Sequence, residues 1–297
     1  MTTGSRETPT INQSSAGHAL SEASWLDAHF EMCRPEYEAM VMSAGFQPGW
    51  KILDAGCGPG SYFPLLADIV GPAGAIHGID IAPENIALAE QRVAGWGLNC
   101  PVELQVGSLL DLPYAGNQFD AVLCSATAQY FSDDDLARVL REFRRVVCPG
   151  GLVAVKDYDG RMERRPGDQA TRWRLLAAIS SEDSQRGTQI RGYLRTGLLK
   201  RWLERSGLED VWQRTVPVER WAPLGSAEQA FLTSVLGGNI AASIATAEFL
   251  GLPESDIAYM RSQADPDSPE HALNDPELHY CETHVIAVGR VPSGSPD

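Results

Sequence analysis

The sequence predicts an α/β fold in which a mostly parallel sheet carries helices on both faces. Between residues 50 and 156, short apolar strand-like runs alternate with amphipathic helix-like runs. This alternation is typical of parallel strands that are covered on both sides. The chain has 297 residues, 43% of them hydrophobic, so it can bury a full core. We therefore expect one sheet domain with helical insertions.

The regular elements follow one another along this stretch. Apolar runs predict strands at residues 50–56, 74–81, 101–108, 119–126 and 151–159. Apolar residues at helical spacing predict helices at residues 61–70, 82–98 and 132–151. The last of these helices has acids in its first turn, arginines in its last turn and a Pro-Gly-Gly stop.

The pattern changes after Asp159, where the chain becomes polar and rich in arginine. A helix, a glycine turn and a sixth strand are predicted within residues 193–221, and a last strand at 282–291. The expected layout is a disordered tail (1–20), N-terminal helices over the active site (21–49), the core (50–159), a cap insertion (160–191), a second part of the core (192–224), a helical cap (225–278) and the last core strand (279–292).

The segment LDAGCGPGSYF, residues 53–63, places a glycine-rich turn after the first strand. In an open parallel sheet, ligands bind at this edge. A dinucleotide fingerprint reads G-x-G-x-x-G, but Ser61 stands where its third glycine would be, and no lysine of a phosphate-binding loop follows. The turn therefore suits a nucleoside without a pyrophosphate. Asp80, 20 residues after Gly60 and at the end of the second strand, can accept hydrogen bonds from both ribose hydroxyls.

With the GSLLDLP turn (107–113) and CPGG (148–151), these motifs resemble the class I S-adenosylmethionine-dependent methyltransferases. The chain looks most similar to the branch of ubiquinone/menaquinone C-methyltransferases and small-molecule natural-product enzymes. The resemblance covers residues 50–156 closely, and 192–220 and 282–291 more loosely. It implies a Rossmann-like, seven-stranded sheet whose last strand is antiparallel, and S-adenosyl-L-methionine as the cofactor.

The resemblance also implies which residues contact the cofactor. They are Asp54, Gly56, Cys57, Gly58 and Gly60 around the methionine moiety, Asp80 at the ribose, Ile81 on the adenine face, Ser108 and Leu109 at the adenine edge, and Ser125 on the sulfonium side. Relatives usually carry aspartate at the position of Ser108, so the adenine contact here is weaker or shifts to the backbone.

The acceptor side offers several candidate residues. Methyl transfer needs a general base only where the acceptor must lose a proton, as with a phenol, an enol or an indole carbon. Asp157 and Tyr158 end the fifth strand, and His284 lies with His279 and Glu282 near the last one; each could be catalytic or structural. Four aromatic side chains could form a cage over the acceptor or pack in the core: Trp25, Tyr37, Tyr130 and Phe131.

The charge of the chain indicates which classes of partner it can bind. A net charge of -15 argues against general affinity for nucleic acid or anionic membrane. Residues 156–205 nevertheless carry 12 of the 24 Lys and Arg residues against 7 acids, which leaves an RNA acceptor open. Against it, the fourth strand is followed by SATAQY, without the Asn/Asp-Pro-Pro-aromatic motif, and no proline precedes Cys124. A non-catalytic cofactor-binding protein is the third alternative.

The six cysteines are scattered without a C-x-x-C pair, so we expect free thiols and no metal site. The apolar run 231–252 contains Asn239 and Glu248 and is expected to form a pair of buried or amphipathic helices, not a membrane span. The sequence thus predicts a cytoplasmic methyltransferase acting on a small aromatic metabolite of the secondary-metabolism type. An indole carbon is one candidate acceptor, and a homodimer remains open.

Overall fold

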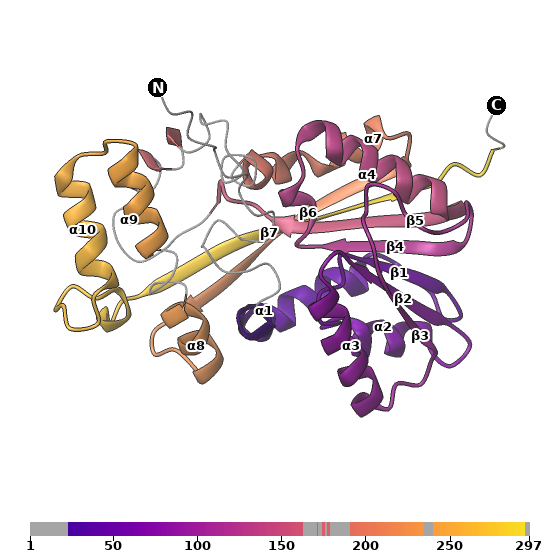
Figure 1. The fold of residues 1–297 in the computed structure, drawn as a ribbon, viewed down its shortest axis with the longest axis horizontal. Helices are drawn as coiled ribbons and strands as arrows, with labels where there is room; N and C mark the ends of the chain where they lie inside the picture. The colour runs from indigo at the N-terminus through magenta and orange to yellow at the C-terminus, as the bar shows by residue number, and fades with distance from the viewer. Residues whose placement is uncertain are drawn as a thin grey trace, which may run out of the picture.

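The computed structural model describes residues 23–162, 191–234 and 240–294, with residues 171, 174, 175, 177 and 178 between them. Within these residues a seven-stranded sheet has the order β3-β2-β1-β4-β5-β7-β6 (Figure 1). Strand β7 is antiparallel to β5 and β6, whereas the other neighbours are parallel. The predicted mostly parallel sheet with an antiparallel last strand is confirmed.

The elements have the following bounds. The strands are β1 Lys51–Ala55, β2 Ala75–Asp80, β3 Val102–Val106, β4 Phe119–Ser125, β5 Val147–Tyr158, β6 Glu209–Trp221 and β7 His279–Arg290. The helices are α1 Ala23–Ser43, α2 Phe63–Val70, α3 Pro83–Trp96, α4 Asp133–Val146, α7 Leu199–Arg205, α8 Ser226–Ser234, α9 Ile240–Phe249 and α10 Glu254–Ala264. Short 3-10 turns are η1 Ala128–Tyr130, η2 Thr196–Leu198 and η4 Ala272–Asn274.

Two hydrophobic clusters cover opposite faces of the sheet. Ile52 packs into the cluster that includes α1, α2 and α3, whereas its neighbour Leu53 packs into the cluster that includes α4 and α7. Successive residues of a strand point to opposite faces, so the near-continuous apolar run of β1 serves both cores. This double burial explains why the core strands read as unbroken hydrophobic stretches.

The start of β5 differs from the prediction. The Pro-Gly-Gly segment was predicted to end a helix, but α4 ends at Val146 and β5 begins at once with Val147. The strand runs through residues 149–151, and its register against β4 shifts between Phe119 and Ala121. Gly150 has a φ of +84°. Proline and glycine therefore form an irregularity within the strand.

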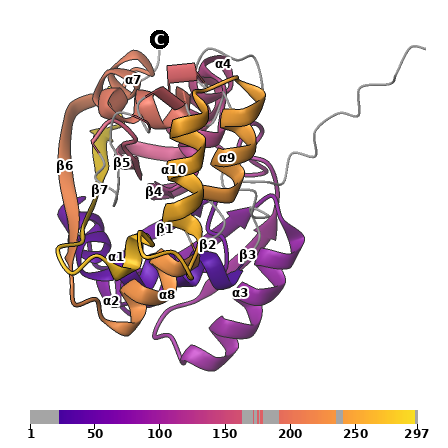
Figure 2. The same ribbon diagram turned by 90° about the vertical axis from the view of Figure 1, so that its left-hand side faces the viewer.

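Strands β6 and β7 pair along their whole length, from Glu209 opposite Arg290 to Trp221 opposite His279. Because Tyr158, the last residue of β5, is opposite His284, the beginning of β7 extends beyond the carboxyl end of β5. The extension leads towards α8, α9 and α10 in Figure 1, and Figure 2 shows α9 and α10 side by side. Helix α1 packs against α8 and β6, so it lies beside this extension.

Some predictions fall outside the described residues. The tail 1–20 and much of the basic segment, including residues 163–170 and 179–190, are among them. The apolar run 231–252 holds the end of α8 and all of α9, with 235–239 not described. Among the helices that are described, none has the length and apolar character needed to cross a membrane.

Candidate active site

The glycine-rich turn between β1 and α2 requires bare backbone. Gly56, Gly58 and Gly60 have φ values of +79°, +53° and +81°, in the left-handed region that favours glycine. A side-chain carbon on Gly56 would collide with Thr127. The amides of Gly56 and Cys57 both donate to the carbonyl of Ile79, at 2.8 and 3.0 Å. The turn is thereby held against the end of β2.

Asp80 lies directly against this turn. One of its oxygens accepts the Gly58 amide at 2.9 Å, and the other accepts the Ala82 amide at 2.9 Å and the Asn85 side-chain amide at 3.3 Å. The next residue, Ile81, exposes 65% of its surface. A carboxylate oriented by backbone amides beside an uncovered apolar side chain is suited to a ribose and a flat base.

Asp54 lies at the floor of the same turn and is 1% exposed. Among the described residues its Oδ2 atom has no hydrogen-bond partner. Burial, with a smaller contribution from the charge of Asp80, raises the pKa of Asp54 to about 8. A buried carboxyl group without a full set of partners is destabilising. A ligand with a cationic group, such as an amino acid ammonium, would supply the missing partner.

The remaining predicted cofactor residues lie just after β3 and at the end of β4. The Gly107 amide donates to the carbonyl of Asp80 at 2.9 Å, which ties the loop after β3 to β2. Ser108 uses its hydroxyl to accept the Leu110 amide at 3.2 Å, and Leu109 is buried. Ser125, at the end of β4, donates to the Tyr62 hydroxyl at 3.2 Å. The predicted residues therefore surround one edge of the sheet.

Two buried charged groups lie side by side at the end of β5. Lys156 is fully buried and its ammonium is 3.0 Å from the centroid of the Tyr37 ring. The next residue, Asp157, accepts the backbone amide of Gln129 at 2.8 Å. Within the described chain, neither Lys156 Nζ nor Asp157 Oδ1 has a hydrogen-bond partner. Burial lowers the pKa of Lys156 to about 7 and raises the pKa of Asp157 to about 7.

Of the four predicted cage residues, the three whose side chains are described do not all lie on one element. Tyr37 packs with Phe30 and Tyr62, its ring centroid 6.0 and 6.4 Å from theirs. Phe131 packs against the cluster on the opposite face of the sheet. Tyr130 belongs to η1. Trp25 belongs to α1, and its side chain lies outside the described residues.

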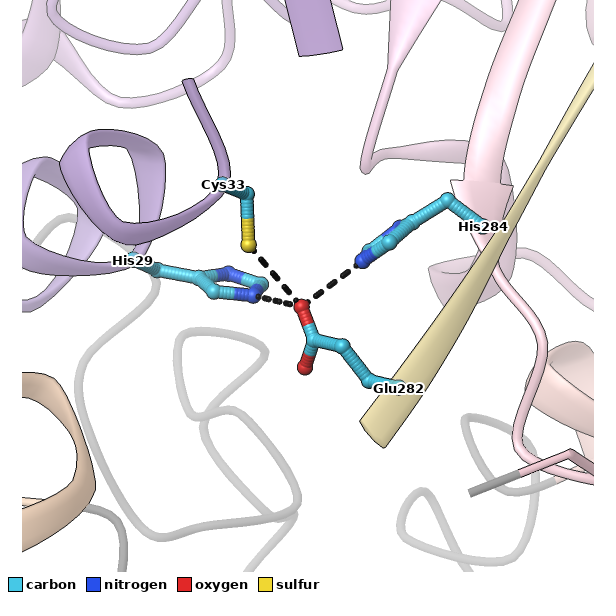
Figure 3. A group of neighbouring side chains, drawn as sticks. All are labelled: His29, Cys33, Glu282 and His284. Carbon is cyan, nitrogen blue, oxygen red and sulfur yellow. Dashed lines mark hydrogen bonds and ion pairs between the residues drawn. The ribbon is translucent and has the colours of Figure 1, made fainter. Parts of the chain in front are cut away.

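His284 takes part in a compact polar cluster between α1 and β7 (Figure 3). Glu282 Oε1 is 2.8 Å from His284 Nε2, 2.8 Å from His29 Nε2 and 3.0 Å from Cys33 Sγ. Burial, followed by the charge of Lys156, lowers the pKa of His284 to about 3. Tyr158 packs its ring against His284, with centroids 5.8 Å apart. His279 instead stacks on Trp221.

Sequence reasoning did not select Lys156, Tyr62, His29 or Cys33. For Lys156 the sequence held a usable signal, because this lysine directly follows the apolar run GLVAV, and strands that are buried on both faces have such continuous apolar runs. His29 and Cys33 are four residues apart in a helical stretch. Their link to β7, about 250 residues away, is visible only in the fold.

Comparison with known proteins agrees with this geometry. Residues 52–151, which run from β1 into β5, match the sequence family described as "Methyltransferase domain". The matched residues make up about a third of the chain, and the match is to a methyltransferase domain. The resemblance seen in the glycine turn is thereby confirmed.

Relatives outline how far this likeness extends. A demethylmenaquinone methyltransferase from Lactobacillus johnsonii is 31% identical over 147 residues, 43% of this chain and 59% of the relative. Methyltransferase GfsG from Streptomyces halstedii is 32% identical over 131 residues, 44% of each chain. The chain thus spans about half the length of the curated relatives that it matches.

Solved structures share the fold more broadly. The YcgJ protein from Bacillus subtilis superposes with a TM-score of 0.52 at 17% identity, covering 86% of this chain and 97% of that one. The BH2331 protein from Bacillus halodurans gives a TM-score of 0.52 at 16% identity with the same coverage. At such identities the likeness shows the fold alone.

Proposed function

We propose that the protein transfers a methyl group from S-adenosylmethionine to a small aromatic metabolite. The observation that carries the cofactor is the buried Asp54 oxygen without a partner, next to a glycine turn and to Asp80. The amino acid ammonium of the cofactor suits Asp54, its ribose suits Asp80 and its adenine suits the exposed Ile81. When bound, this cofactor supplies a methyl group on a cationic sulfonium.

The acceptor would lie beyond the ends of β4 and β5. Ser125 and Lys156 are opposite each other in the sheet register, and Tyr62 and Tyr37 adjoin them. Aromatic faces favour flat or cationic ligands. Positioning the acceptor in line with the sulfonium and excluding water would supply much of the rate enhancement.

Asp157 is the favoured proton acceptor. Its Oδ2 atom is held by the Gln129 amide while Oδ1 is without a partner in the described residues. With a pKa raised to about 7, the carboxyl group is matched to proton transfer near neutral pH. It would take the proton of a phenol, an enol or an indole nitrogen. Tyr158 and His284 remain candidates for orienting the acceptor from the opposite side.

Two relatives support a ring-bearing acceptor. The Lactobacillus johnsonii protein and one from Symbiobacterium thermophilum, 34% identical over 138 residues, are named demethylmenaquinone methyltransferases. Their names give demethylmenaquinone, a quinone, as the substrate. An indole carbon is a comparable target for this chain.

The direct test is an acceptor screen with the full chain. Indoles, phenols and quinols are incubated with S-adenosylmethionine, and S-adenosylhomocysteine is measured with and without acceptor. We expect acceptor-dependent formation with at least one ring compound. Cofactor binding without any turnover would favour a non-catalytic protein, and transfer to RNA alone would overturn the small-molecule assignment.

A further inference from the structure

The cluster between α1 and β7 brings together four side chains that are common metal ligands. His29 and Cys33 come from α1, and Glu282 and His284 come from β7 (Figure 3). Residues four apart share one face of a helix, and residues two apart share one face of a strand. The four ligand atoms all lie within 4.8 Å of one another. Each element therefore presents two ligands to the same point.

We propose that His29, Cys33, Glu282 and His284 bind one divalent transition metal ion of the zinc type in a tetrahedral site. Two nitrogens, one sulfur and one carboxylate oxygen form a donor set that suits zinc or cobalt, whereas magnesium and calcium prefer oxygen alone. The expectation of no metal site rested on cysteine spacing, which cannot detect a site with a single cysteine.

The arrangement of the atoms supports a central ion. His29 Nε2, His284 Nε2 and Cys33 Sγ converge on one atom, Glu282 Oε1, at 2.8, 2.8 and 3.0 Å. Zinc is bound at about 2.0–2.1 Å by histidine nitrogen and about 2.3 Å by cysteine sulfur. An ion near the place of Oε1 would therefore draw these three donors in by less than about 1 Å. The carboxylate would withdraw by a side-chain rotation and become the fourth ligand.

Charge and burial fit the same ion. A thiolate at Cys33 and the carboxylate of Glu282 together neutralise a divalent cation, and the two histidines bind as neutral imidazoles. Binding releases the thiol proton of Cys33 to solvent. Cys33, Glu282 and His284 are 0%, 3% and 1% exposed, whereas the side chain of His29 is 17% exposed. The ion would enter past His29.

Neighbouring side chains hold the ligands in place. The Tyr280 hydroxyl donates to the second oxygen of Glu282 at 2.5 Å. Phe231 stacks on His29, with ring centroids 4.5 Å apart and planes at 11°. Such outer contacts orient ligands in metal sites. Bound metal would join α1, which precedes the methyltransferase domain, to the last strand of the sheet.

The test is a cobalt titration of the full chain after treatment with a chelator. We expect one Co²⁺ per chain, with a tetrahedral d–d spectrum and a thiolate-to-cobalt charge-transfer band, and displacement by Zn²⁺. In Cys33→Ser the band should vanish and affinity should fall at least about tenfold. Cys148→Ser is the matched control, because that thiol bonds to the carbonyl of Asn117, away from the cluster; it should bind cobalt as the wild type does.

Two results would overturn the site. The first is failure of the folded wild-type protein, checked by circular dichroism, to bind cobalt. That failure would show that the cluster is only a hydrogen-bonding network around Glu282. The second is retention of the charge-transfer band in Cys33→Ser, which would show that Cys33 is not a ligand. If Cys33→Ser does not fold, His29→Gln at the more exposed edge provides the same test through at least about tenfold weaker binding. The readout is metal binding itself, so it does not depend on methyl transfer.

Discussion

Two buried carboxyl groups, Asp54 and Asp157, have different parts in the proposed reaction, one on the cofactor side and one on the acceptor side. Each is 1% exposed and has one oxygen that finds no partner in the described residues. Each has a pKa raised by burial, to about 8 and about 7. We infer that Asp54 receives the positive end of the cofactor and that Asp157 receives a proton.

Cofactor affinity should depend on pH through Asp54. Because its pKa is raised, Asp54 is protonated in the free protein below about pH 8. The contribution of the buried, protonated carboxyl group to folding stability is lost as the pH rises through that value. A bound ammonium favours the ionised form, so binding releases a proton and tightens as pH rises from 6 to 8, by up to about tenfold per pH unit. Calorimetry at several pH values measures this.

The matched variant is Asp54→Asn, in which the pH dependence should disappear and binding should be weak throughout. Wild-type affinity that stays constant between pH 6 and 8 would contradict the role of Asp54.

Asp157→Asn should slow turnover by about 10²–10⁴-fold without changing the affinity for S-adenosylmethionine. In the wild type, activity should rise with pH through about 7 as Asp157 ionises, and the variant should lack this rise. Steady-state rates over pH 5.5–8.5 test the prediction, with the exposed Asp134 changed to asparagine as control. A variant with normal turnover would remove Asp157 from catalysis.

At the scale of elements, the turn after β1 depends on backbone conformation. Gly56→Ala would place a side chain against Thr127 at a φ of +79°, so it should both destabilise the protein and weaken cofactor binding more than tenfold. Gly95→Ala, near the end of α3 with no atom close to the added carbon, should instead stabilise it by about 0.5–1 kcal/mol. Thermal unfolding and calorimetry compare the two. Equal behaviour would show that the turn tolerates a side chain.

The sequence allowed most elements to be predicted, because the core strands and helices carry strong local periodicity. The exception at Pro149, Gly150 and Gly151 is instructive. These residues are equally compatible with a helix stop and with an irregular strand start, and only the pairing of β5 with β4 decides between them. The glycine turn and Asp80 were predictable because their spacing is local. Lys156, and the contacts between α1 and β7, depend on residues that meet only after folding.

At the scale of the whole molecule, segments on either side of residues 52–151 pack against one another. Helix α1 packs against α8 and β6, whereas α9 and α10 lie at the end of the molecule towards which β7 extends (Figure 1). Arg220 of β6 joins two of these segments, with both terminal nitrogens 2.9 Å from the carboxylate of Glu36 on α1. We therefore expect the contact between α1 and β6 to contribute to the stability of the fold.

Arg220→Ala should lower the stability of the folded protein by about 1–3 kcal/mol, because a partly buried, charge-assisted pair is lost. Arg201→Ala removes an exposed pair with Glu204 on α7 and should leave stability unchanged. Thermal unfolding of both variants gives the comparison. If the two variants unfold at the same temperature, the ion pair between Arg220 and Glu36 does not hold α1 to β6.

The central claim is that the glycine turn and Asp80 bind S-adenosylmethionine, and calorimetric titration tests it most directly. The wild type should bind S-adenosylmethionine and S-adenosylhomocysteine. Asp80→Ala should bind both at least about tenfold more weakly, since a charge-assisted hydrogen bond to the ribose is lost. Asp68→Ala, an exposed acid on α2, should bind as the wild type does. Failure of the folded wild-type protein to bind either compound would contradict the account.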